Sequence, residues 1–257
     1  MVPYYLTIVN ICSCTLATKE PALVSAYYDE LRRGFSADRL SKYQPDGTID
    51  FDAAVNYFWN MALSEALYAS LGALEVTLRN AIHNAASRRF QTEYWFDTPQ
   101  ILKYRQPGDV VKARFTLTRE NKPHTAGRIV AELSFGFWTT LLSDPYHSSF
   151  WMADRAWMLK ETFPHMPNSQ RVRNQIYARY NSLRLLRNRI FHFEPIWHRP
   201  NLAQQHAQIL EAIGWVNPTV RRSLGIIDHF PETYERGQRI IAEMLKDHLD
   251  FPEAHPL

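Results

Sequence analysis

The side chains best suited to chemistry in this sequence stand close together, at Arg187, Asn188 and His192. An imidazole titrates at about pH 6.5 in unstructured peptides, so a histidine can take up and release protons near neutral pH. A guanidinium offers a planar fork of N–H donors that matches a phosphate group, and a carboxamide can orient either partner. Together these residue types indicate acid–base chemistry at a phosphate.

These residues are predicted to lie near the C-terminal end of a helix. Asn188 and His192 are four positions apart and are therefore neighbours on one helical face, with Arg187 one position round from Asn188. A proline disfavours helical geometry in the residue before it, so Pro195 predicts that the helix ends near residues 193–194. Apolar residues recur along the helix at three- and four-residue steps, as one buried stripe requires: Ile176, Tyr180, Leu183, Leu186 and Ile190.

The alternative to a functional site is an ordinary amphipathic helix, because the Arg-x4-His spacing is short and permissive. The charge of the region favours a site. Glu194 is the only acidic residue between positions 171 and 199, and an anion is therefore the expected partner. The basic residues that carry this argument are Arg171, Arg173, Arg179, Arg184, Arg187, Arg189 and Arg199.

A second long helical segment is predicted over residues 50–90, either as one bent helix or as two helices. Glu75, Arg79 and His83 repeat every four residues and so stack along one face. Two interpretations stay open: an ion pair within the helix between Glu75 and Arg79, or a pocket that Arg79, Asn80 and His83 line together with the motif around Arg187. The apolar stripe of the segment is predicted to be Val55, Phe58, Trp59 and Ala62, followed by Leu67, Leu71, Leu74, Leu78, Ile82 and Ala85.

Length and composition set the outer limits of the fold. The chain has 257 residues, of which 46% are hydrophobic, which is enough for a sizeable core. We predict one helical domain over residues 21–249, an N-terminal tail or overextended start at 1–20, and a C-terminal tail at 250–257. Residues 111–118 alternate with the period of a strand, but a single strand has no partner with which to form a sheet, so a helix is the better prediction there.

Several classes of protein are disfavoured. A net charge of +3 does not suit a basic protein that coats nucleic acid, so positive charge must act locally. The sequence has no glycine-rich nucleotide loop, no His-Glu-x-x-His, no Cys-x-x-Cys and no Gly-x-Ser-x-Gly, so we expect no cofactor and no metal. Cys12 and Cys14 are too close for a disulfide, which indicates a reduced, cytoplasmic chain. No stretch is long and apolar enough to predict a membrane helix.

The ordered set of motifs resembles the Abi-like (Abi_2) abortive-infection family of the HEPN superfamily. The resemblance covers roughly residues 25 to 230 and rests on pieces that occur in the family's order: Leu40–Tyr43, Tyr57–Asn60, Leu74–Ile82, Glu132–Trp138 and Leu186–Ile196. It implies an all-α fold, a HEPN-like helical bundle with additional helices and long irregular connections. Residues 110–118 would accordingly be helical.

The resemblance also implies an activity. Arg187, Asn188 and His192 match the family's Arg-x4-His motif, in which a polar residue follows the arginine. HEPN nucleases cleave RNA without a metal by attack of the ribose 2′-hydroxyl on the adjacent phosphate, which leaves a 2′,3′-cyclic phosphate. The supporting residues would be Glu75, Arg79, Asn80 and His83. The residues that contact the RNA backbone would be Arg184 and Arg189.

The expected partners follow from this hypothesis. RNA, with transfer RNA among the candidates, would be the substrate of a toxin or effector in phage defence. One chain supplies a single clear histidine whereas the reaction benefits from both a base and an acid, so a homodimer with a composite site is expected. An antitoxin or another regulatory partner is a further candidate, and no membrane partner is expected. The alternatives are a catalytically silent HEPN module that binds RNA, a nucleotide or a partner protein, and a purely structural oligomer.

Overall fold

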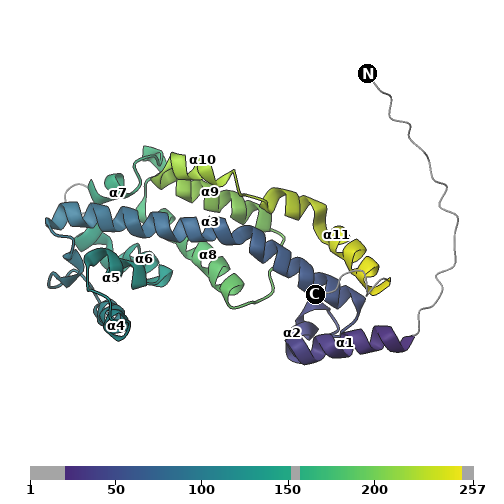
Figure 1. Cartoon of the computed structure of the whole chain (residues 1–257). Helices are drawn as coiled ribbons and strands as arrows, with labels where there is room; N and C mark the ends of the chain where they lie inside the picture. The colour runs from purple at the N-terminus through teal and green to yellow at the C-terminus, as the bar shows by residue number, and fades with distance from the viewer. Residues whose placement is uncertain (1–20, 152–156, 251–257) are drawn as a thin grey trace, which may run out of the picture. The chain divides into compact units, whose positions relative to one another are not determined.

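A computed structural model describes residues 21–151 and 157–250, and every regular element in those ranges is helical (Figure 1). The all-α prediction is confirmed. The α-helices are α1 (Pro21–Phe35), α2 (Ala37–Leu40), α3 (Phe51–Phe90), α4 (Gln106–Arg119), α5 (Ala126–Glu132), α6 (Phe135–Leu141), α7 (Trp157–Thr162), α8 (Arg173–Phe191), α9 (Leu202–Val216), α10 (Pro218–Leu224) and α11 (Phe230–Asp250). Short helical turns lie at Ser41–Tyr43, Trp95–Asp97, Asp144–Tyr146, His147–Trp151 and Asn168–Gln170.

The chain divides into two compact units, which among the described residues are 21–56 with 238–250, and 57–151 with 157–237. The division within α11 falls at Gly237, whose φ of 64° and ψ of −165° interrupt the helical backbone. Glycine adopts such a conformation without the steric penalty that a side chain would bring. The single domain predicted over 21–249 stays a prediction. The predicted tail at 1–20 lies outside the described residues, and α11 continues to residue 250.

The first unit shows how short polar side chains set helix boundaries. Ser36 separates α1 from α2 with a φ of 68°. Asp50 precedes α3, and its Oδ1 accepts a hydrogen bond from the N–H of Ala53 at 2.9 Å. That bond lowers the pKa of the Asp50 carboxyl, because it stabilises the charged form. Asn56 then ties α3 to the preceding turn by donating to the carbonyl of Tyr43 at 2.8 Å.

The second unit has a core built on α3 and α8. The predicted stripe on α3 is confirmed for its larger part, whose members are fully buried: Leu67, Leu71, Leu74, Leu78, Ile82 and Ala85. Nearer the start of α3, the predicted Phe58, Trp59 and Ala62 are only half-buried. The stripe on α8 is buried as well, and the hydroxyl of Tyr180 donates to the carbonyl of Ala212 on α9 at 3.0 Å. Both helices therefore present one face to a common core, and their remaining faces are available for a site.

The segment with the strand-like pattern belongs to a helix, α4, as predicted. Val110, Ala113 and Leu117 are buried, whereas Val111 and Phe115 are 65% and 68% exposed. The alternation in the sequence arose because apolar residues lie on the exposed side of α4 as well as on its buried side.

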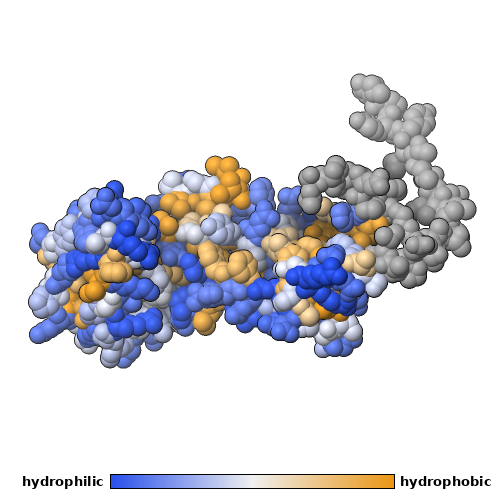
Figure 2. All heavy atoms as spheres, turned by 60° about the horizontal axis from the view of Figure 1, so that its bottom comes forward, coloured by the Kyte–Doolittle hydropathy of each residue, from blue (hydrophilic) through white to orange (hydrophobic). Residues whose placement is uncertain are grey.

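No helix in the described part of the chain is both long and apolar enough to cross a membrane. On the face shown in Figure 2, apolar side chains form separate patches bounded by hydrophilic residues.

Candidate functional site

The helix that carries the motif ends earlier than predicted. α8 ends at Phe191 and does not reach Phe193 or Glu194. The cause is the left-handed backbone of Phe193, whose φ is 57°. The N–H of Phe193 donates to the carbonyl of Ile190 at 3.0 Å, and the N–H of Glu194 donates to the carbonyl of Arg189 at 2.8 Å. This pair of bonds is a Schellman motif, which closes a helix and satisfies its last carbonyls.

His192 therefore lies directly after the helix, with φ −96° and ψ 10°. Its backbone N–H donates to the carbonyl of Asn188 at 2.9 Å, which keeps the two residues one turn apart. The His192 side chain is exposed, and within residues 21–151 and 157–250 its imidazole has no hydrogen-bond or ion-pair partner. Asn188 is half-buried on the last turn of α8. The imidazole is thus available to a ligand from outside the chain.

Arg187 is held in place by two neighbours. Its Nη2 lies 3.2 Å from Oε2 of Glu75 on α3, and the two side chains are only 26% and 18% exposed. The guanidinium carbon also lies 4.0 Å from the ring centroid of Phe191, within the range of a cation–π contact. The Nε of Arg187 is buried and has no hydrogen-bond partner in the described ranges. The guanidinium is therefore fixed in orientation, with part of its donor capacity unused.

An exposed tyrosine extends this arrangement. The ring of Tyr68 on α3 stacks on the ring of Phe191, with centroids 5.4 Å apart and planes inclined by 17°. Arg187, Phe191 and Tyr68 thus form a continuous set of planar groups across two helices. Tyr68 was not among the site residues predicted from the sequence, although it is seven residues from Glu75 and so lies on the same face of α3.

The segment after the motif is anchored by Asn60, a buried residue of α3. Its Oδ1 accepts hydrogen bonds from the backbone N–H groups of Ile196 at 2.7 Å and of Trp197 at 3.2 Å. These bonds fix the chain beyond His192 against α3. Asn60 belongs to one of the motifs that carry the family resemblance, but the sequence did not indicate it as a site residue. Nothing in its local spacing points to a partner 136 positions away.

Of the two interpretations left open for this face of α3, the ion pair between Glu75 and Arg79 is not formed, because Glu75 pairs with Arg187 instead. Arg79 points elsewhere: its Nε lies 3.4 Å from Oδ1 of Asn80, and its Nη1 lies 3.5 Å from the carbonyl of Ala131 on α5. Both distances are at the long end of hydrogen-bond range. An exposed pair within one helix contributes only a few tenths of a kcal/mol, so a partner on another helix readily replaces it.

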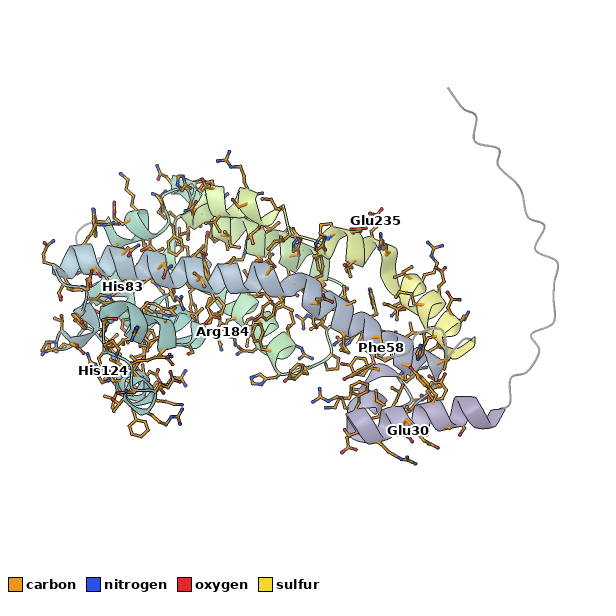
Figure 3. All side chains as sticks on the ribbon, in the orientation of Figure 1. Glu30, Phe58, His83, His124, Arg184 and Glu235 are labelled. Carbon is orange, nitrogen blue, oxygen red and sulfur yellow. The ribbon has the colours of Figure 1, made fainter. Side chains whose placement is uncertain are left out.

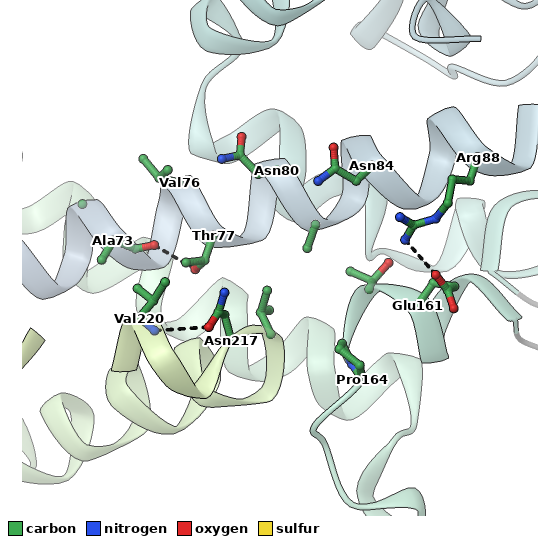
Figure 4. A pocket seen from close by; sticks show the side chains of 14 residues that line it. Ala73, Val76, Thr77, Asn80, Asn84, Arg88, Glu161, Pro164, Asn217 and Val220 are labelled. Carbon is green, nitrogen blue, oxygen red and sulfur yellow. Dashed lines mark hydrogen bonds and ion pairs between the residues drawn. The ribbon is translucent and has the colours of Figure 1, made fainter. Parts of the chain in front are cut away.

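Asn80 lies on α3 as well, but it lines a cavity away from the motif. A cavity of about 540 Å³ lies between α3 and the segments around α7 and α10 (Figure 4), and its wall includes Asn80, Asn84 and Thr162. An ion pair between Arg88 and Glu161, 2.7 Å long, also lines it. None of the motif residues belongs to the cavity wall. Asn80 thus lines a cavity that the motif does not line, and the interpretation in which it shares a pocket with the motif stays a prediction.

His83 serves the core rather than the motif. Its Nδ1 accepts a hydrogen bond from Nε1 of Trp95 at 3.1 Å, and Trp95 is fully buried. Burial lowers the pKa of His83, because it penalises the charged imidazolium, although the nearby Glu93 acts in the opposite direction. In the described chain, Glu75 is thus the one supporting residue that contacts Arg187.

Each arginine of the basic cluster around the motif has a partner within the chain, and for four of the seven that partner is an acid. Arg184, labelled on α8 in Figure 3, donates to Oδ1 of Asn181 at 2.8 Å. Arg189 donates to the carbonyl of Pro195 at 3.0 Å and lies 3.4 Å from Glu194. The remaining arginines also have partners: Arg171 with Asn168, Arg173 with Asp144, Arg179 with Glu211, Arg187 with Glu75, and Arg199 with Gln205.

These contacts correct the charge argument drawn from the sequence. Asp144, Glu211 and Glu75 lie far from the motif in sequence, so counting acids between positions 171 and 199 overlooked them. The surplus of positive charge on α8 is consequently smaller than the sequence suggested. An anion that binds here would be recognised by oriented N–H donors more than by net charge.

In the described ranges, no group of three or more His, Cys, Asp or Glu side chains is arranged to hold a metal ion. Comparison of the chain with protein-family models, curated proteins and solved structures finds no match.

Proposed function

We propose that the chain is a metal-independent endoribonuclease of the HEPN type that acts as a toxin or effector in phage defence. The observation that carries the proposal is the exposed His192 imidazole, which has no internal partner in the described chain and lies one turn from Asn188 at the end of α8. Reactive acid–base groups must reach the substrate, and an imidazole already committed to the core would not. The motif resemblance supplies the reaction class.

The reaction assigns a task to each side chain. A base removes the proton of the ribose 2′-hydroxyl, the 2′-oxygen forms a bond to phosphorus, the bond from phosphorus to the 5′-oxygen breaks, and an acid protonates that oxygen. His192 exchanges these protons. Arg187 donates to the phosphate as its negative charge grows, and Asn188 orients the imidazole or the phosphate.

Glu75 and Phe191 act as positioning residues for Arg187. The carboxylate takes Nη2 of the guanidinium, and the Phe191 ring lies against its plane. Nε is buried, so Nη1, which has no partner in the described chain, is the donor left for a phosphate oxygen. Holding the guanidinium in advance avoids a reorganisation cost during the reaction, although Glu75 also offsets part of the positive charge.

One copy of the motif supplies one uncommitted imidazole, so the proposal includes a homodimer. A two-fold axis beside the end of α8 would bring two copies of His192 to one phosphate, one as base and one as acid. An antitoxin that covers the same helix end would keep the enzyme silent.

Cleavage of total and transfer RNA in excess EDTA tests the proposal. Wild-type protein is expected to produce 2′,3′-cyclic phosphate ends, and His192→Ala to lower the rate by about 100-fold or more. His165→Ala is the matched control, since His165 is another exposed histidine of the same unit that is not part of the motif, and it should cut like wild type. Loss of cleavage in EDTA, or equal rates for His192→Ala and wild type, would contradict the proposal.

A second candidate is a catalytically silent HEPN module that binds RNA, a nucleotide or a partner protein. The ion pair of Arg187 with Glu75 favours it, because an arginine committed to a carboxylate can be purely structural. This candidate predicts binding without cleavage. A purely structural oligomer would instead predict that Arg187→Ala alters stability or assembly alone.

A further inference from the structure

We propose that Tyr68 and Phe191 form a stacking platform for an unpaired nucleobase next to the scissile phosphate. This inference rests on the proposed function and names the class of RNA that the site takes. The platform consists of two rings from different helices, stacked at 5.4 Å, and its Phe191 ring also lies 4.0 Å from the guanidinium of Arg187.

The exposure of Tyr68 is the first argument. Its side chain is 61% exposed although it lies within a helix whose other face forms the core. In the described chain it has no second ring contact, and its hydroxyl has no hydrogen-bond partner. A single exposed tyrosine is ordinary in itself. This one, however, is held nearly parallel to a second ring, so a flat apolar surface is presented to solvent in a fixed orientation.

The position of the platform is the second argument. Phe191 is the last residue of α8, and His192 follows it directly. A phosphate that reaches His192 and Arg187 would therefore place one of its flanking nucleotides beside Phe191 and Tyr68. Arginine and aromatic planes that adjoin one another are the surface on which unpaired bases stack.

The chemistry of the occupant follows from the platform. Every base has a flat π face, so stacking tolerates any sequence, whereas a base inside a duplex already has both faces covered. The Tyr68 hydroxyl has no fixed partner, so the ring rather than the hydroxyl should carry recognition. The substrate class is thus single-stranded RNA or the loop of a folded RNA, and paired RNA should bind poorly.

The test measures binding by the full-length chain with His192→Ala, which removes cleavage. The probes are a 12-nucleotide single-stranded RNA that contains 2-aminopurine and the same strand annealed to its complement. Tyr68→Ala should weaken binding of the single strand by about tenfold or more and abolish quenching of the 2-aminopurine. Tyr68→Phe should preserve both, and Tyr68→Leu should lose the quenching because leucine has no π face.

Tyr104→Ala is the matched control, because Tyr104 is 79% exposed in the same unit and is not stacked on Phe191. It should bind as the parent does. The platform is overturned if Tyr68→Ala binds the single strand unchanged while the wild-type chain still cuts RNA. It is also overturned if Tyr68→Ala dissociates a dimer without changing quenching, since the ring would then contact a second copy. If wild-type protein neither binds nor cuts RNA, the proposed function fails together with the platform.

Discussion

Two faces of α3 carry polar groups that one interpretation of the sequence placed in a single site. The two faces differ in charge and in the size of the hollow beside them. One face meets the end of α8, where Glu75 fixes Arg187 and His192 stays exposed. The other lines a cavity of about 540 Å³, whose wall includes Asn80, Asn84 and the mutually paired Arg88 and Glu161. The first has charged, oriented groups without a large hollow, whereas the second has a hollow without a free acid–base group. Cavity size alone is therefore a poor guide to where chemistry takes place in this chain.

The largest expected difference between the two faces is in catalysis. Arg187→Ala should lower the rate of RNA cleavage by about 100- to 1,000-fold, because it removes the donors that meet the growing phosphate charge. Asn84→Ala, in the cavity wall, should leave the rate within about twofold of wild type. Single-turnover cleavage of one defined RNA measures both. Equal losses would show that the cavity belongs to the active site.

The next difference concerns stability and compares two asparagines of α3. Asn60→Ala leaves the N–H groups of Ile196 and Trp197 without their acceptor and should lower the free energy of unfolding by about 1–3 kcal/mol. Asn80→Ala should change it by less than about 0.5 kcal/mol, because Asn80 is exposed. Urea denaturation followed by circular dichroism provides the values. Similar results for the two variants would mean that the segment after α8 has other anchors.

A third comparison separates the half-buried His83 on α3 and the buried His206 on α9 from the exposed His192. Burial lowers the pKa of both His83 and His206 in the folded chain. At pH 7.5 both histidines are neutral in the folded and in the unfolded chain, so protonation does not lower the free energy of unfolding there. Below about pH 6.5 the unfolded chain takes up protons first, and stability falls as the pH approaches the lowered folded values. Urea midpoints should therefore drop between pH 7.5 and 5.5.

Replacing both His83 and His206 with glutamine should flatten this dependence of the urea midpoint on pH. The carboxyls whose pKa is lowered, such as Asp50, titrate below this window and do not contribute to it. A urea midpoint that rises as the pH falls would contradict the lowered pKa values of His83 and His206.

The smallest effect compares one ion pair from each face. Glu161→Gln in the cavity removes a pair with Arg88 whose members are 33% and 56% exposed, and it should cost less than about 0.5 kcal/mol. Glu75→Gln removes a less exposed pair and should cost about 1 kcal/mol. It should also reduce cleavage several-fold, because Arg187 would lose its orientation. If both variants lower stability equally, the pair with Arg187 is an ordinary surface contact.

The features predicted correctly from the sequence are those that depend on local periodicity. The buried stripes of α3 and α8 follow from residues three and four positions apart, so the helices and their inward faces could be recognised without any tertiary knowledge. The end of α8 was placed too late, because the left-handed backbone of Phe193 is unusual for a residue with a bulky side chain.

The features that were missed depend on contacts between distant segments. Arg187 was recognised as a functional candidate, but its partner Glu75 lies on another helix and was assigned to Arg79 instead. Asn60 and Tyr68 have no local signal, because their partners follow more than a hundred residues later in the chain. Residue types and spacing could thus identify the motif, and only the packing of α3 against α8 could show which groups surround it.

Four arginines of α8 pair with acids of the same chain, and this affects how strongly the affinity for RNA would depend on salt concentration. Binding that neutralises many phosphates releases many counterions and weakens steeply as salt is added. Here the arginines around His192 already have partners, among them Glu194 for Arg189. An RNA held by one oriented guanidinium and by stacking would displace few ions. We therefore expect a shallow dependence of affinity on potassium chloride, which would let the site discriminate RNA by shape at the ionic strength of a living cell.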